Sequence, residues 1–469
     1  MDVRHKARLN PRAQAAVALL VAAALAGCAQ TPTQPSASAA GVSPGTVSAQ
    51  GGRTAAPGAP AQGQGAAGPA VSSTPTAAST VPAQVPAAAP VAPAPPAWQQ
   101  GRSAGMASSK LAPHAGKLTA TPASEIPIDK LKLPPGFKAE IWATGIPGAR
   151  AMAFGDGGKV YVGTRGIGRV YEVTDQGGQR TSRVVVDKLV QPAGVEYRNG
   201  SLYVMAINKV LRFDGIATKP DVQPVDMTDK FALPPEQHHN WKYIRFGPDN
   251  KLYVPFGAPC NICEPGKEYA QIRRYNADGS GMEVIATGVR NTVGFDWHPT
   301  TKELWFTNHQ RDWMSDDLPE DELHKISRTG QNFGFPYCHN GSVPDADIKK
   351  DRPCAGVSAP VALLGPHAAA MGIHFYTGNM FPAAYRNAAF VARKGSWNRT
   401  QKTGYDVVMV TPGANGGSAK ITPFMTGFLN PQDETFWGRP AYIAQMKDGS
   451  LLVSDEQLGA IYRITHAGR

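Results

Sequence analysis

Six short apolar runs recur from residue 160 onward, each opened by polar or turn-forming residues. The runs are Val160–Val162, Leu202–Val204, Leu252–Val254, Leu304–Phe306, Ala389–Val391 and Leu451–Val453. Their central residues lie 42, 50, 52, 85 and 62 positions apart. A strand unit repeated at spacings of this size is typical of a β-propeller, and six copies predict six blades.

A second strand follows each of these runs. The partner segments are Arg169–Val173, Lys209–Phe213, Gln271–Tyr275, Glu322–Ile326, Asp406–Val410 and Ala460–Ile464. Most of them alternate polar and apolar residues, the pattern of an antiparallel strand with one exposed face. The first runs are more continuously apolar, as expected between neighbouring blades. An unrelated β-sandwich is the alternative, but its strands would not be expected to keep one composite pattern through six units.

The pattern therefore predicts an all-β fold, a six-bladed β-propeller of four-stranded antiparallel blades within residues 121–469. A ring of blades that stays open exposes unpaired strand edges. We therefore expect Phe137–Ala143 to pair with the last blade, beside Ala460–Ile464.

The first 27 residues have the organisation of a secretory signal peptide, with a positive stretch followed by the apolar segment Ala15–Leu25. The signal ends in Leu25-Ala26-Gly27-Cys28, which resembles a bacterial lipobox. The resemblance implies an exported lipoprotein that is anchored to a membrane by lipid on Cys28. Ala29, where an inner-membrane lipoprotein would have Asp, favours the outer membrane facing the periplasm. An ordinary signal peptide with an unrelated cysteine is the alternative.

Residues 28–120 consist mainly of Ala, Pro, Gly, Ser, Thr and Gln. Arg53 is the only charged residue between Arg12 and Arg102. A segment of this composition cannot bury a core, which predicts a disordered tether between the anchor and the propeller.

The formal net charge of the chain is +11. Residues 1–120 hold eight Lys or Arg and one Asp and so contribute +7, whereas the remaining 39 basic and 35 acidic residues contribute +4. This balance gives no reason to expect nucleic acid as a partner, although it is compatible with a local anion site.

Apart from Cys28, the chain has four cysteines, Cys260, Cys263, Cys338 and Cys354. An even number in an exported chain favours disulfides. Cys338 and Cys354 would close a loop of moderate length, and Cys260 could pair with Cys263, but the sequence leaves the connectivity open. A zinc site with His339 nearby is the alternative, which suits an oxidising compartment less well. The sequence gives no haem attachment motif, because Cys263 is not followed by His.

Five segments next to the expected strands combine polar, aromatic and cationic residues. They are Gln237–Lys242, Gly288–Gly294, Thr307–Asp317, Arg393–Arg399 and Trp437–Pro440. Loops of a propeller converge around its central channel, so these segments are the candidates for a functional site.

Several longer motifs extend these segments. They are Glu236–Trp241, Gly257–Cys263, Gly288–Pro299, Gly334–His339 and Gly395–Arg399. With them, residues from about 133 to 463 resemble the sugar dehydrogenases that depend on pyrroloquinoline quinone (PQQ). The branch that they resemble most is L-sorbosone dehydrogenase, related to soluble aldose and glucose dehydrogenases. The resemblance implies an oxidoreductase that oxidises an aldose or a sorbosone-like sugar by hydride transfer to bound PQQ.

The resemblance also implies a catalytic base. In this family a histidine removes the proton of the sugar's anomeric hydroxyl while hydride passes to the quinone, and the matching position is His239. The adjacent His238 is the rival, because a shift of one residue exchanges the two. A loop histidine that is bonded only to the backbone is the structural alternative.

PQQ is a planar quinone with three carboxylates, so its site requires cations. The resemblance implies that Arg290 and Asn291 contact the quinone oxygens and that Lys394 and Arg439 lie near the carboxylates. Arg399 is a weaker candidate on the same loop as Lys394. For Lys394 and Arg439 the alternative is a solvated surface charge.

Calcium (Ca²⁺) is the metal that the resemblance implies. The family's protein ligands are backbone carbonyls in the loop that matches His309–Arg311, so we expect the carbonyls of Gln310 and Arg311 to bind it. Related enzymes usually have Gly where this chain has Gln310, and Gln would be strained there if the position required a positive φ. Three nearby carboxylates, Asp316, Asp317 and Asp321, are read more simply as part of an acidic solvated loop.

Two other functions compete with this one. A six-bladed lactonase or hydrolase binds its metal through carboxylates and Asn, whereas these loops supply Arg, Lys and His, which suit an anionic cofactor. A non-catalytic propeller that binds a protein or glycan is the other, and the fold alone is compatible with it. The presence of His239, Arg290, Asn291 and Arg439 in one chain argues against it. The sequence names neither the sugar nor the electron acceptor, for which a cytochrome and a quinone are both candidates.

Overall fold

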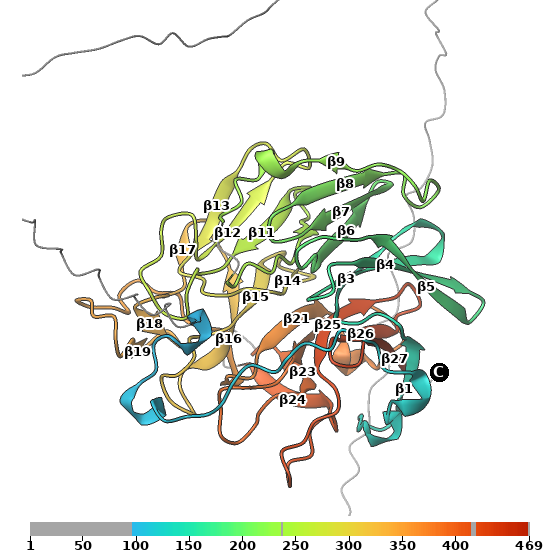
Figure 1. Ribbon diagram of the computed structural model, residues 1–469. Coiled ribbons are helices and arrows are strands. Elements are labelled where there is room, and N and C mark those ends of the chain that lie inside the picture. The colour runs from blue at the N-terminus through green and yellow to red at the C-terminus, as the bar shows by residue number, and fades with distance from the viewer. Residues whose placement is uncertain (1–95, 236–237, 414–418, 468–469) are drawn as a thin grey trace, which may run out of the picture. The chain divides into compact units, whose positions relative to one another are not determined.

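In the computed structural model, residues 96–235, 238–413 and 419–467 are described, and all of them belong to the compact unit Ala88–Arg469. The predicted signal peptide, Cys28 and most of the predicted tether lie outside these residues. Within them, six antiparallel sheets are arranged as the blades of a propeller (Figure 1). No helix of the described part is long and apolar enough to cross a membrane.

The six blades follow one another along the chain. Blade 1 contains β2 (Ala149–Phe154), β3 (Lys159–Thr164), β4 (Val170–Gln176) and β5 (Gln179–Val186), and blade 2 contains β6 (Gly194–Arg198), β7 (Ser201–Met205), β8 (Val210–Asp214) and β9 (Val225–Asp226). Blade 3 contains β10 (Arg245–Phe246), β11 (Leu252–Phe256), β12 (Gln271–Tyr275), β13 (Glu283–Thr287) and β17 (Gln331–Asn332), and blade 4 contains β14 (Phe295–Trp297), β15 (Leu304–Asn308), β16 (Glu320–Ile326) and β20 (Ala362–Pro366). Blade 5 contains β21 (Ala370–Phe375), β22 (Ala389–Arg393), β23 (Asp406–Thr411) and β24 (Lys420–Met425), and blade 6 contains β25 (Pro440–Gln445), β26 (Leu451–Asp455), β27 (Ala460–His466) and β1 (Phe137–Ala143).

The sixth blade closes the ring with strands from both ends of the propeller. β1 pairs antiparallel with β27, and Ala139 lies opposite Ile464. The predicted six-bladed fold and the predicted closure are both confirmed. The blades have the expected four strands except blade 3, to which β17 adds a short parallel fifth strand.

The first strands of the blades form the inner ring. β2 contacts β6 and β25, and β21 contacts β14 and β25. Neighbouring strands approach so closely here that Gly372 in β21 has no room for a side chain, since a Cβ would lie 2.8 Å from the Cα of Tyr442. The second strands lie between neighbouring blades and are almost entirely buried, as their continuous apolar pattern predicts.

Short elements complete the fold. They are the two-stranded sheet β18 (Cys338–His339) and β19 (Val343–Pro344) and the 3₁₀ turns η1 (Ala97–Gln99), η2 (Ala104–Met106), η3 (Ala123–Glu125), η4 (Ile128–Lys130), η5 (Asp156–Gly158), η6 (Thr228–Lys230) and η7 (Ala383–Tyr385). The four described cysteines form disulfides, as expected, and the structure pairs Cys260 with Cys263 and Cys338 with Cys354.

The N-terminal arm, residues 96–121, contacts loops of blades 3, 4, 5 and 6. The Ser103 N–H donates to the Trp313 carbonyl at 3.0 Å, and the Thr121 N–H donates to the Leu458 carbonyl at 2.8 Å. Between them, His114 Nε2 lies 3.0 Å from the Tyr405 hydroxyl. The prediction of a disordered tether up to residue 120 is therefore wrong for the arm. A few side chains of the arm find partners on the loops, and average composition does not register such individual contacts.

Candidate active site

One cavity of about 360 Å³ gathers the predicted site residues, within the usual range of ligand pockets. Its walls include His238, His239, Arg290, Asn291, Gln310, Lys394 and Arg439. They come from loops that enter the first strand of a blade or leave its second strand. Because these two strands are antiparallel, both loops lie at the same edge of the blade.

His239 precedes β10 and is buried at the wall of the cavity. Its Nδ1 lies 3.1 Å from the Ala258 carbonyl, and a carbonyl oxygen can only accept a hydrogen bond. The proton therefore resides on Nδ1, and the lone pair resides on Nε2. Burial, then the charges of His238 and Arg290, holds the pKa of His239 well below its usual 6.5. The ring is neutral at neutral pH, which is the state that a general base requires.

The backbone at His239 has an uncommon conformation. Its φ is +52°, in the left-handed region that histidine adopts more readily than most residues. Gly257, the residue after β11, provides the space, since a Cβ there would lie 2.6 Å from the His239 Cβ. Two loops of blade 3 thus fix the position of this imidazole.

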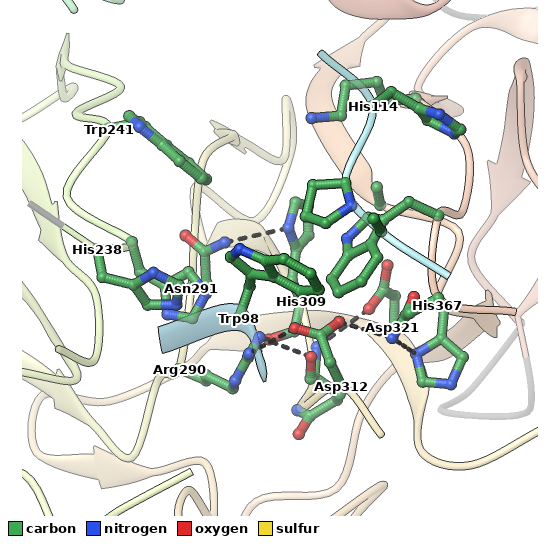
Figure 2. Close-up of a pocket in the computed structure, with 18 of the residues that line it drawn as sticks. Trp98, His114, His238, Trp241, Arg290, Asn291, His309, Asp312, Asp321 and His367 are labelled. Atoms are coloured by element: carbon green, nitrogen blue, oxygen red, sulfur yellow. Dashed lines mark hydrogen bonds and ion pairs between the residues drawn. The ribbon is translucent and has the colours of Figure 1, made fainter. Parts of the chain in front are cut away.

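His309 and Asn291 form a connected pair next to it. His309 Nε2 donates to the Ala370 carbonyl at 2.6 Å, so Nδ1 is free to accept from the Asn291 side-chain amide at 3.1 Å. Burial, then the charge of Lys394, lowers the pKa of His309 to about 3. Asn291 Oδ1 is buried and has no hydrogen-bond partner among the described residues. Figure 2 shows the Asn291 to His309 bond and the neighbouring His238.

Arg290 lies beneath these side chains and is fully engaged with the protein. Its Nε and Nη2 donate to the carbonyl and side-chain oxygens of Asn261, each at 2.8 Å. Its Nη1 donates to the Gln310 carbonyl at 2.6 Å and to the His309 carbonyl at 3.2 Å. Arg290 therefore fixes the loop that follows β15.

Four cations, of which three are buried and Arg165 is half-buried, form a second group with one carboxylate, Glu456. We call this group the cationic cluster. Its cations are Arg150, Arg165, Lys394 and Arg439. Glu456 lies 2.5 Å from Arg150, 3.5 Å from Lys394 and 3.6 Å from Arg439. Burial opposes the charge of Glu456, but these cations outweigh it and hold the pKa of Glu456 well below its usual value. One carboxylate cannot neutralise four cations, so the cluster attracts anions.

The expected calcium loop has a different arrangement. Gln310 is absent from the residues with positive φ, so the strain considered from the sequence does not arise. Its carbonyl accepts from Arg290, and no group of three or more His, Cys, Asp or Glu side chains among the described residues could hold a metal ion. Calcium ligation by Gln310 and Arg311 stays a prediction.

Two carboxylates lie beside that loop. Asp312 accepts from Asn398 at 2.7 Å and pairs with Arg290 at 3.3 Å. Asp321 accepts from the N–H groups of Gln310 and Ala370. Burial raises the pKa of Asp321 to about 7, in spite of these two donors.

Arg311 and Arg399 have structural partners away from the cavity wall. The Arg311 side chain is buried and pairs with Asp345 at 2.8 Å. Arg399 pairs with Asp317 at 2.7 Å. The geometry gives Arg399 no role in the cavity.

Residues 131–467 match a family model described as TrAA12-like. The chain belongs to the TrAA12-like family. A curated relative, an uncharacterized protein of Borreliella burgdorferi, is 33% identical to this TrAA12-like protein over 357 residues, which cover 73% of this chain and 93% of the relative.

Solved structures share the fold of the TrAA12-like chain. The holo form of the pyranose dehydrogenase PQQ domain from Coprinopsis cinerea is 20% identical, with a TM-score of 0.60, over 72% of this chain and 97% of that one. The calcium structure of the Trichoderma reesei family AA12 enzyme is 18% identical, with a TM-score of 0.61, over 75% and 99%. The PQQ-bound aldose sugar dehydrogenase from Streptomyces coelicolor is 18% identical, with a TM-score of 0.50, over 71% and 99%. The resemblance to PQQ-dependent sugar dehydrogenases is confirmed at the level of the family.

Some residues of the TrAA12-like site lie outside the five candidate segments, namely Trp98, His114, Arg150, Arg165, His367 and Glu456. Others lie within those segments, but their side chains were assigned no role, namely Trp241, His309, Asp312, Trp397 and Asn398. A signal for some of them was present, since Arg165, His309 and Glu456, like the predicted Lys394, each follow directly the second strand of a blade. The side chains of the arm follow no strand of a blade. Their only signal in the sequence is that Trp and Arg appear again after a long uncharged segment.

Proposed function

We propose that this protein binds PQQ in the cavity and uses it to oxidise a sugar of the aldose or sorbosone type. The observation that carries the proposal is a neutral, backbone-fixed histidine in the same cavity as a buried cluster with excess positive charge. An anionic cofactor and a proton acceptor would then lie side by side. The family membership supports the same assignment.

The residues present fit PQQ. The cationic cluster has one carboxylate for four cations, and the imbalance of three charges matches the three carboxylates of PQQ. Among the described residues no donor reaches the Oδ1 of Asn291, and Asn291 lines the same cavity. When bound, PQQ supplies a quinone that accepts a hydride.

His239 performs the proton transfer in this proposal. Its Nε2 accepts the proton of the sugar hydroxyl, and the bond from Nδ1 to Ala258 keeps the ring in the tautomer that can do so. His309 acts through Asn291, whose amide it holds. Lys394 and Arg439 bind the carboxylates of the cofactor, and Arg290 orients the loop of His309 and Gln310 at the cavity wall.

Calcium is the second part of the proposal. The Trichoderma reesei relative was solved with calcium, and Asp312 and Asp321 bring carboxylates to the loop whose carbonyls are the expected ligands. Adding Ca²⁺ to chelator-treated protein should raise its affinity for PQQ. An affinity for PQQ that does not change with Ca²⁺ would contradict the calcium site. Arg290 would then be the cation that binds the carbonyls of this loop.

The test of the function is a screen of the purified protein with PQQ and Ca²⁺ against aldoses and sorbosone, with an artificial dye as acceptor. We expect dye reduction that requires both PQQ and sugar. Dye reduction that occurs without added or bound PQQ would contradict the proposal. The absence of dye reduction with every sugar in the screen would contradict it as well. The natural acceptor, a cytochrome or a quinone, is then sought among those that replace the dye.

We further propose that the protein is an exported lipoprotein of the outer membrane that faces the periplasm. The sequence Leu25-Ala26-Gly27-Cys28 supports this location. The change Cys28→Ser should release the protein into the soluble fraction with its dehydrogenase activity intact. Membrane association that survives this change would contradict the lipid anchor.

A further inference from the structure

The N-terminal arm lies outside the part of the chain that matches the family, which begins at residue 131. It nevertheless contributes Trp98, Pro113 and His114 to the wall of the cavity. Figure 2 shows Trp98 among the site residues, with Asn291 to one side and His367 to the other. Because the arm is added to the family's fold at the wall of the cavity, it affects which molecules can enter the cavity.

The first anchor of the arm is a group of indoles. Trp313 is completely buried, and its Nε1 donates to the Trp98 carbonyl at 2.5 Å. The Arg102 guanidinium lies 4.2 Å from the centre of the Trp313 ring. Two further bonds fix the backbone, from Asn261 Nδ2 to the Gln100 carbonyl at 2.7 Å and from Arg311 Nη2 to the Gly101 carbonyl at 2.5 Å.

The second anchor is His114, which lies across the cavity on the loops of blades 5 and 6. Its ring centre is 4.7 Å from that of Phe436, and its Nε2 is within 3.0 Å of the Tyr405 hydroxyl. Burial, then the charge of Arg439, lowers the pKa of His114 to about 4, so the contact does not depend on protonation near neutral pH. With anchors on both sides, the arm is fixed over the cavity.

Trp98 is the residue of the arm that offers a flat apolar surface. Its ring contacts Trp397 edge to face, with 5.8 Å between the ring centres. Unlike Trp313, it is only half-buried, and it lines the cavity. Two other indoles line the cavity. Trp397 packs between Trp98 and Trp313, and Trp241 already has the Arg165 guanidinium over its ring at 4.3 Å. The C–H face of a sugar ring packs well on an aromatic ring, because both are flat and apolar.

We propose that the arm is the roof of the active site and that the sugar packs on Trp98, which restricts the substrate to monosaccharide size. The inference rests on the proposed function. The restriction follows from the place of the arm, since a roof that is fixed on both sides of the cavity limits the space left for a sugar beside the cofactor.

The test compares Trp98→Ala and Trp98→Phe with Lys110→Ala, a control on an exposed residue of the same arm. For each, PQQ affinity is measured by titration, and KM and kcat are measured with the best monosaccharide. Trp98→Ala should raise KM roughly tenfold with little change in PQQ affinity, because it removes one aromatic contact. Trp98→Phe should restore most of the loss, and Lys110→Ala should behave as wild type. Wild type should oxidise the monosaccharide and not a disaccharide of the same sugar.

Three results would overturn the inference. They are an unchanged KM in Trp98→Ala, a loss of PQQ affinity as large as the rise in KM, and efficient oxidation of the disaccharide by wild type. The second result would place Trp98 over the cofactor instead of the sugar. A wild-type protein that shows no PQQ-dependent oxidation of any sugar would instead refute the proposed function, and the role of Trp98 with it.

Discussion

The cavity has two walls that differ in electrostatic character, although most side chains of both are buried. One is the cationic cluster, in which Glu456 faces Arg150, Lys394 and Arg439. The other is the imidazole wall, made of His238, His239 and His309 with Asn291. Two of these imidazoles, His239 and His309, hydrogen-bond to backbone carbonyls. The two walls differ because their polar partners differ. A carboxylate stabilises the charged form of a neighbouring cation, whereas a backbone carbonyl selects one neutral tautomer of a histidine.

In the proposed function, one pocket divides cofactor binding and proton transfer between neighbouring groups. Burial lowers the pKa of Lys394 and of His239 alike, each well below its ordinary value. For the histidine this produces a neutral base at neutral pH. For the lysine it produces a cation whose charge an incoming anion would stabilise.

The largest effect is expected on the imidazole wall. The change His239→Ala removes the base and should lower kcat by about 10² to 10⁴, while PQQ affinity stays close to wild type. The measurement is steady-state dye reduction at saturating PQQ, together with a PQQ titration. His238→Ala is the matched control and should keep most of the activity. The reverse outcome, with His238→Ala inactive and His239→Ala active, would move the base by one residue.

The matching change on the cationic cluster should have the opposite signature. Arg439→Ala should weaken PQQ binding roughly 10- to 100-fold and leave turnover at saturating PQQ much less affected, because it removes a charge-assisted contact. Arg328→Ala, at an exposed arginine, serves as the control for the loss of one positive charge. Equal effects of the two arginine changes would show that net charge, and not the cluster, determines the affinity.

A substitution of Glu456 tests whether the single carboxylate stabilises the cationic cluster. Glu456→Gln leaves the buried cations without a partner and should lower Tm by roughly 5 to 10 °C in the absence of PQQ. Saturating PQQ should restore much of this loss, since its carboxylates replace the missing one. A variant whose Tm is unchanged without PQQ would show that the cations do not depend on Glu456.

The smallest expected effects are those of pH, and they differ between the imidazole wall and the cationic cluster. The pKa of His239 lies below 6.5, so kcat should not decline as the pH falls from 7 through 6.5, the range in which an exposed histidine becomes protonated. PQQ affinity should instead fall as the pH rises above neutrality. Burial lowers the pKa of Lys394, and an anion beside it would raise that pKa, so binding is linked to proton uptake. A PQQ affinity that is constant across this range would contradict the role of Lys394.

The fold was predictable because its signal repeats. The apolar runs correspond to β3, β7, β11, β15, β22 and β26, and closure by β1 followed from the need to cover an edge. Site residues were predictable where they occupy a repeated position. In five blades the third residue after the run is a residue of the site or adjoins it, namely Arg165, Gly257, His309, Lys394 and Glu456.

What could not be predicted depends on single contacts between distant segments. Nothing in the local sequence of Trp98 or His114 indicates that these residues reach Trp397 and Tyr405, about 300 positions away. The engagement of Arg290 with the Gln310 carbonyl is a contact of the same kind. Such contacts depend on loop geometry, which neither periodicity nor composition encodes.

The central claim is that one cavity binds PQQ and delivers a sugar proton to His239. It is tested most directly by titrating PQQ into the cofactor-free protein and measuring sugar-dependent dye reduction at each step, for wild type and His239→Ala in parallel. The account predicts that wild-type activity rises and saturates near one equivalent of PQQ, while His239→Ala binds the same amount and remains nearly inactive. Wild-type activity that does not respond to PQQ, or a His239→Ala protein that turns over like wild type, would contradict it.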